Sequence, residues 1–162
     1  MHREPDGVLH AYVALQKPMG WVSQIEAADP SVALACVALE FDGWNPALTA
    51  LITDGGTVPV VRPIHALPAA HRWNRIPGVT LLGDAAHLMA PAGDGANLAM
   101  VDGAELGEAI AAHPGDLETA LAAYEERVFP RSADAAAGSI EVLDACLGGG
   151  APYSLVRFLR GS

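Results

Sequence analysis

The sequence predicts a mixed α/β (α+β) fold, in which a few strands and two helices precede a series of C-terminal helices. Three observations support this prediction. Short runs rich in β-branched residues are separated by turn residues in the first half of the chain. Two pairs, Asp29-Pro30 and Asn45-Pro46, are typical helix starts. Beyond Gly95, apolar residues recur at helical spacing almost to the C-terminus.

Three extended segments are expected. Val8–Leu15 alternates weakly between apolar and polar residues, which is typical of a strand. Val58–Leu67 is β-rich, but Pro59 and Pro63 have no N–H for a ladder, so we expect an edge strand or an irregular one. Val79–Leu82 is apolar without alternation, which predicts a strand covered on both faces.

The helices are predicted from their caps and from their apolar stripes. The helix opened by Asp29 should reach about Phe41, and the one opened by Asn45 should end before the turn at Asp54. A third helix should begin near residues 95–97 and end at Pro114-Gly115. Its expected buried face consists of Ala99, Gly103, Leu106 and Ile110.

Asp116 is expected to cap the next helix. Pro130 should kink or divide that helix, because proline removes one intrahelical hydrogen bond. The apolar stripe continues to Gly148, and a last short helix is expected over Tyr153–Leu159. We expect residues 1–72 and 73–162 to form two regions packed as one compact unit.

Composition restricts the class of protein. The chain has 162 residues, 51% hydrophobic and 17% charged, so either its core is large or apolar surface faces another chain. A net charge of −10 argues against nucleic acid as a partner. No apolar run approaches the length of a membrane helix, and no signal peptide is apparent. Cys36 and Cys146 do not make a disulfide framework, so a cytoplasmic protein with reduced, buried thiols is expected.

The most informative segment runs from Gly83 to Leu106. Asp84 follows the strand expected at 79–82, where open α/β folds bind ligands, and its carboxylate can accept hydrogen bonds from sugar-like hydroxyls. Alternatively, Asp84 caps a short helix. Gly93 and Gly95 allow a flat ring to approach bare backbone, and the following helix offers free N–H groups. Alternatively, they form an ordinary glycine loop before a helix.

Two other kinds of site find little support. Asp84 and His87 together supply two metal ligands, too few for a zinc site. No Gly-x-Ser-x-Gly elbow is present, so nothing indicates hydrolase chemistry. Trp44 and Trp73 either line an aromatic pocket or pack in the core.

The segment closely resembles the second flavin-contacting motif of FAD-dependent aromatic-ring hydroxylases, the family of p-hydroxybenzoate hydroxylase and the tetracycline-modifying monooxygenases. The resemblance rests on Gly83, Asp84, His87, Pro91, Gly93, Gly95, Asn97 and Asp102. It implies a partial p-hydroxybenzoate hydroxylase-like fold without the N-terminal Rossmann unit. Residues 1–72 would be part of the substrate domain, with strands and two helices, and residues 73–162 would carry the flavin-contacting motif and the C-terminal helices. The resemblance also implies FAD as cofactor and His87 as a structural residue. The implied cofactor-binding residues are Gly83, Asp84, Pro91, Gly93, Asp94, Gly95, Ala96 and Asn97.

The resemblance further implies NAD(P)H- and O2-dependent hydroxylation of an aromatic or polyketide-like small molecule, with no side chain of this chain as a catalytic residue. Members of the family also carry a Gly-x-Gly-x-x-Gly fingerprint, which this sequence lacks. We therefore expect the C-terminal part of such an enzyme, inactive alone. Its partner would be the FAD-binding half, or a second copy joined through exposed apolar surface.

Two alternatives remain. The chain could be a half-protein or binding module that associates with a separate FAD-binding chain. It could also be an unrelated α/β binding protein in which the motif arose by chance.

Overall fold

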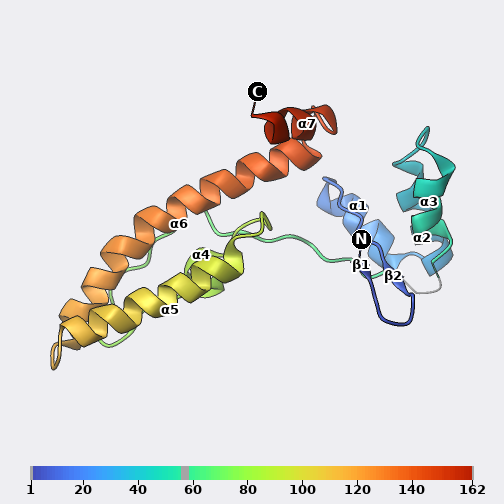
Figure 1. The fold of residues 1–162 in the computed structure, drawn as a ribbon. Coiled ribbons are helices and arrows are strands. Elements are labelled where there is room, and N and C mark those ends of the chain that lie inside the picture. The colour runs from blue at the N-terminus through green and yellow to red at the C-terminus, as the bar shows by residue number, and fades with distance from the viewer. Residues whose placement is uncertain (1, 56–58, 162) are drawn as a thin grey trace. The chain divides into compact units, whose positions relative to one another are not determined.

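The computed structural model describes residues 2–55 and 59–161, which fall into two compact units, Met1–Pro63 and Ile64–Ser162 (Figure 1). The contacts within the chain place the division at 63/64, nine residues before the expected division at 72/73.

The first unit consists of a hairpin and three helices. Strands β1 (His2–Arg3) and β2 (Leu9–His10) pair antiparallel, with Arg3 opposite Leu9. The helices that follow are α1 (Met19–Ala27), α2 (Pro30–Leu39) and α3 (Pro46–Thr53). Helix α2 packs against both α1 and α3.

Two helix starts predicted from the sequence are confirmed. The Asp29 side chain accepts a hydrogen bond from the Ser31 amide at 3.0 Å, and Asn45 accepts one from Ala47 at 2.9 Å. Each cap satisfies one of the amides that a helix N-terminus leaves unpaired. The hydrogen bonds from Ser31 also lower the pKa of the Asp29 carboxyl. Helix α1 was not predicted, since neither a cap residue nor a clear apolar stripe marks it.

The expected strands are largely wrong. Only Leu9–His10 of the segment Val8–Leu15 is a strand, and residues 59–67 form none. Residue 58 lies outside the described residues. Val79 forms an isolated bridge with Ile76, and residues 80–82 pair with no strand of the described chain. A strand needs a partner for its backbone groups, and the local sequence does not supply one. The described residues are therefore mostly helical, with one short hairpin, instead of a mixed α/β fold.

The second unit is built on two long helices that lie side by side, α5 (Gly95–Ala112) and α6 (Leu117–Leu147) (Figure 1). Asp116 caps α6 by accepting from the Thr119 amide at 3.0 Å, as predicted. Helix α6 continues through Pro130, so of the two predicted outcomes, a kink or a division, the division is wrong. The short α4 (Asp84–His87) packs against α6, as does α7 (Tyr153–Arg160), which confirms the last predicted helix.

The core of the second unit lies between α5 and α6. It contains Ala109, Ala120, Tyr124 and Val128, with Trp73, Leu106 and Phe129 packed against it. The rings of Trp73 and Phe129 meet edge to face with centroids 4.7 Å apart. Core packing is therefore the correct interpretation of Trp73. Trp44, in the first unit, is 52% exposed and contacts Phe41.

The buried face of α5 differs from the predicted one. Asp102 and Ala109 are buried and Leu106 is half-buried, whereas Gly103 and Ile110 are exposed. The prediction counted apolar residues and so excluded a carboxylate that points into the protein. Cys36 and Cys146 are free and half-buried rather than fully buried.

Candidate functional site

A glycine turn joins the extended segment 79–82 to α4. Gly83 has φ of +58° and ψ of −141°, a backbone conformation that only glycine adopts readily. A Cβ at this position would lie 3.4 Å from the Cβ of Ala99 in α5. The positive φ, rather than the space beside α5, therefore requires glycine at this turn, and the direction of the chain at Asp84 depends on it.

The carboxylate of Asp102 organises the interior behind this turn. Asp102 is fully buried, and its Oδ2 accepts hydrogen bonds from the Gly83 amide at 2.7 Å and lies 2.6 Å from His87 Nε2. Its Oδ1 accepts from the Arg131 guanidinium at 2.6 Å. Arg131 also pairs with Glu105, one turn further along α5. A buried carboxylate is stable only with such partners, and here each oxygen has at least one.

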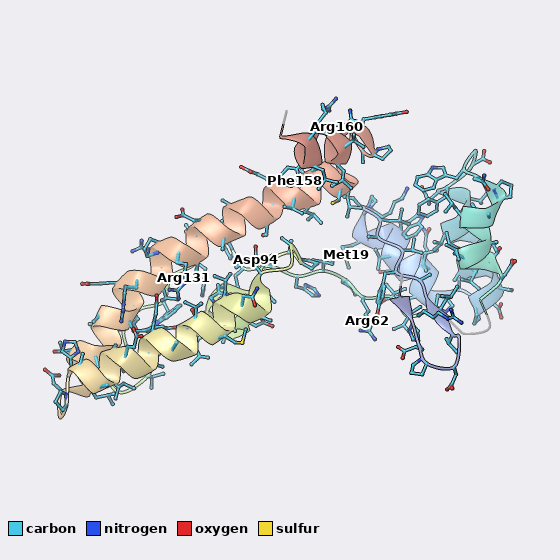
Figure 2. All side chains as sticks on the ribbon, viewed as in Figure 1. Met19, Arg62, Asp94, Arg131, Phe158 and Arg160 are labelled. Carbon is cyan, nitrogen blue, oxygen red and sulfur yellow. The ribbon has the colours of Figure 1, made fainter. Side chains whose placement is uncertain are left out.

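The surroundings of Arg131 perturb its acidity. Burial alone would lower the pKa of this guanidinium, but the hydrogen bonds to Glu105 and Asp102 outweigh burial and raise that pKa. Arg131 is therefore a permanent cation between the two carboxylates. Figure 2 shows Arg131 on α6 and Asp94 at the start of α5.

Asp84 differs from Asp102 in its exposure and in its bonding partners. Its side chain is exposed, and within residues 2–55 and 59–161 it takes part in no hydrogen bond or ion pair. The N-cap of α4 is Gly83, and no side chain caps that helix. The alternative that Asp84 is a helix cap therefore receives no support, and its carboxylate is available to a ligand.

The loop before α5 is open. Gly93 has φ of +105°, and an added Cβ at Gly93 or Gly95 would meet nothing within 4 Å. Asp94 is the N-cap residue, but its side chain does not cap the helix. The first backbone bond of α5 runs from the Leu98 amide to the Asp94 carbonyl at 2.9 Å. The amides of residues 95–97 thus have no hydrogen-bond partner in the described chain, as expected at an uncapped N-terminus.

The structure brings Gly83 to α5, where its amide bonds Asp102 and where an added Cβ would lie beside Ala99. Of the eight predicted cofactor-binding residues, Gly83 is buried and Gly95 half-buried. The exposed ones are Asp84, Pro91, Gly93, Asp94, Ala96 and Asn97. A flavin presents hydroxyls, a flat ring and acceptor atoms. The free carboxylate can bind the hydroxyls, the space beside the two glycines can hold the ring, and the unpaired amides can donate to the acceptor atoms.

Sequence reasoning missed two residues that support the site. Arg131 follows Tyr124 and Val128 at helical spacing, so a charge on that buried stripe could have indicated a buried partner. Glu125 is buried beside Tyr124 and accepts from the side chains of Trp73 at 3.2 Å and Thr80 at 2.9 Å. These bonds hold the segment that leads into Gly83 against α6.

Further partners hold the same segment. Glu118 pairs with Arg75 and accepts from the Gly78 amide at 2.6 Å, and the two contacts lower the pKa of the Glu118 carboxyl. The Tyr124 hydroxyl donates to the Leu81 carbonyl at 3.1 Å. The segment 75–81 is thus held by side chains of α6, and in the described chain its contact with another extended segment is limited to the Ile76–Val79 bridge.

Two absences apply to residues 2–55 and 59–161. No group of three or more His, Cys, Asp or Glu side chains in that part of the chain is placed to hold a metal ion. Nor does any helix there combine the length and the apolar composition needed to cross a membrane.

Comparison with known proteins identifies a family and several relatives of this chain. Residues 63–139 match the FAD binding domain family, and this range includes all eight predicted cofactor-binding residues. A FAD-dependent urate hydroxylase of Mycolicibacterium vanbaalenii is 39% identical over 97 residues, which cover 58% of this chain and 24% of that protein. A FAD-dependent monooxygenase of Beauveria bassiana is 37% identical over 90 residues, covering 53% of this chain and 21% of that protein.

A dual O-methyltransferase/FAD-dependent monooxygenase of Phaeosphaeria nodorum is 39% identical over 89 residues, covering 53% of this chain and 9% of that protein. The chain spans less than a quarter of the length of each of these three relatives. The matched segment coincides with the helices and turns that form the candidate site. Residues 63–139 are therefore similar to the FAD binding domain of FAD-dependent, aromatic hydroxylase-like monooxygenases, and this similarity supports FAD as the cofactor.

Proposed function

We propose that this chain supplies the C-terminal, flavin-contacting part of a monooxygenase that uses NAD(P)H and O2 to hydroxylate an aromatic or polyketide-like small molecule. The observation that carries the proposal is the exposed, unpaired carboxylate of Asp84, set beside α5 by the Gly83 turn. The match of residues 63–139 to the FAD binding domain family supports it. The residues that would hold FAD are Gly83, Asp84, Pro91, Gly93, Asp94, Gly95, Ala96 and Asn97.

Each of these residues has a distinct part in the proposal. Asp84 accepts hydrogen bonds from the ribityl hydroxyls, because a carboxylate has several acceptor sites. Gly93 and Gly95 leave space for the ring against the backbone, since neither has a Cβ. The free amides at the start of α5 stabilise negative charge on the ring. Bound FAD supplies the redox chemistry and the activation of oxygen, and the protein holds it and excludes water.

We also propose a partner. In this proposal a second polypeptide region carrying a dinucleotide-binding fingerprint completes the FAD site, because the sequence of this chain has none. Exposed apolar side chains of the second unit support a docking surface, among them Val79, Leu82, Met100, Val101 and Ile110. Without that partner the chain would bind FAD weakly and have no hydroxylase activity.

The first test is Asp84→Ala. The full chain is titrated with FAD, and binding is followed by flavin absorbance and fluorescence; the parent should bind FAD weakly. The affinity of the variant should be lower by roughly 10-fold or more, because a hydrogen bond to a charged group contributes about 1.5–3 kcal/mol. Glu108→Ala removes an exposed carboxylate of α5 and should leave binding unchanged. Equal affinity in the Asp84 variant and the parent would contradict the role given to Asp84. Tight binding by the chain alone would favour a binding module over part of an enzyme.

The second test concerns the apolar surface. In sedimentation velocity, the parent chain should show association that increases with concentration, because large apolar side chains are exposed. Met100→Lys and Val101→Glu, which place charges on α5 at exposed positions, should reduce that association. A parent chain that stays monomeric at high concentration would contradict the proposed surface.

A further inference from the structure

We propose that Asp102 is the positioning residue of the turn formed by Gly83 and Asp84, and that Arg131 holds Asp102 in the required orientation. The inference rests on the proposed function, since the direction of this turn matters only if Asp84 contacts the flavin. It assigns a role in the site to two residues that do not touch the cofactor themselves.

One oxygen of Asp102 holds both ends of α4. Its Oδ2 accepts from the Gly83 amide at 2.7 Å, at the N-cap of α4, and lies 2.6 Å from Nε2 of His87, the last residue of that helix. A charged acceptor makes such hydrogen bonds shorter and about twice as strong as neutral ones. Asp84, the first residue of α4, lies between these two anchored positions, so its backbone is fixed on both sides.

The other oxygen of Asp102 bonds to Arg131. Oδ1 accepts from the guanidinium at 2.6 Å, and the same guanidinium pairs with Glu105. Because the two oxygens have different partners, a rotation of the carboxylate would break the bonds to the turn and to Arg131 together. The orientation of the turn therefore depends on a residue of α6, although α6 contributes no residue to the proposed cofactor contacts.

Nothing in the described chain holds the Asp84 side chain directly. Its position before a ligand arrives is set only by the backbone of the turn. A binding group that is fixed in advance loses less conformational entropy on binding, which makes the anchoring of its backbone a determinant of affinity.

The positioning role can be separated from a purely structural one. If Asp102 only stabilised the packing of α5 on α6, its loss would lower the protection of amides throughout both helices. If it positions the turn, its loss should change the amides of Gly83 and its neighbours first. The amide proton of Gly83 is the direct reporter, because a hydrogen bond to a carboxylate shifts it downfield and slows its exchange.

The experiment uses ¹H–¹⁵N NMR of the full chain without flavin. In the parent, the Gly83 amide proton should be shifted downfield and protected from exchange. Asp102→Leu removes both acceptor oxygens and should reduce that protection roughly 10- to 100-fold, the equivalent of a hydrogen bond to a charged group. Asp102→Asn restores one neutral acceptor and should restore part of the shift. Glu105→Gln alters the other partner of Arg131 and should leave the Gly83 signal unchanged.

In a second experiment, the same variants are titrated with FAD, and Asp102→Leu should lower the affinity for FAD about 10-fold. If the parent binds no FAD, the proposed function fails, whereas the Gly83 signal still decides the positioning role. A parent Gly83 amide that exchanges like a free amide overturns the inference, even if no variant folds. Equal loss of protection at Gly83 and along α5 and α6 in Asp102→Leu also overturns it, because Asp102 would then act only on packing.

Discussion

Replacing Arg131 by methionine should destabilise the second unit by about 3–5 kcal/mol, because it leaves the fully buried charge of Asp102 without its cation. Methionine keeps much of the length of the arginine stem, so lost packing contributes little. Neither His87 nor the Gly83 amide replaces a permanent positive charge. The effect is large relative to the total stability of a unit of this size.

Two variants act as controls for this result. Arg127→Met makes the same chemical change one turn earlier in α6, where Arg127 is exposed and its guanidinium donates to backbone carbonyls at 3.3–3.4 Å. It should have an effect within about 1 kcal/mol. The double variant Asp102→Asn with Arg131→Met should be more stable than Arg131→Met alone, because no net charge then remains buried.

The measurement must report on the second unit by itself. Hydrogen–deuterium exchange of the full chain gives opening free energies for α5 and α6, with the amides of α2 and α3 as an internal reference. If Arg131→Met lowers these opening free energies no more than Arg127→Met does, the buried charge of Asp102 does not need Arg131 as its cation.

The helices that the sequence predicted well are those with local signals. Asp29, Asn45 and Asp116 each cap a helix through an amide two or three residues away, so the cause of each helix start lies within a few residues. A kink or a division of α6 was predicted at Pro130 because proline removes one hydrogen bond. Its buried stripe continues on both sides of Pro130, through Val128 and Ser132, and packing of that stripe outweighs the missing bond.

The strand predictions were wrong because a strand depends on distant residues rather than on local signals. Whether Val79–Leu82 forms a strand depends on a partner chain segment, and a run of apolar residues does not reveal whether one is present. In this structure the Tyr124 hydroxyl and the Glu125 carboxylate bond to this segment instead. Such contacts link residues 43 to 45 positions apart, which no local pattern contains.

Part of the candidate site could be predicted because its residues are adjacent in sequence. Gly83 and Gly93 have positive φ, a backbone conformation that glycine favours, and Asp84 follows Gly83 directly. The support behind the site could not be predicted in the same way. Arg131 lies 29 positions from Asp102, and the pairing depends on how α5 packs on α6.

Tyr124→Ala should lower the free energy of unfolding of the second unit by about 3–5 kcal/mol. Tyr124 is fully buried in the core between α5 and α6, and removing its ring would leave a cavity. The loss includes the hydrogen bond to Leu81, so the segment leading to the Gly83 turn should also become more mobile. Tyr124→Phe keeps the ring and removes only the hydroxyl, which should cost about 1 kcal/mol. Exchange of the α5 and α6 amides measures both effects. Equal losses in the two variants would mean that the ring contributes nothing.

The same pair of variants predicts a pH dependence. Burial, followed by the nearby charge of Asp102, raises the pKa of Tyr124 above its ordinary value. Its contribution to stability is then fully present below the unfolded pKa of about 10 and is lost as the pH rises from there towards the folded pKa. Tyr124→Phe cannot ionise, so its opening free energy should fall less steeply above about pH 10 than that of the parent. Identical slopes would mean that the Tyr124 hydroxyl ionises in the folded chain as readily as in the unfolded one.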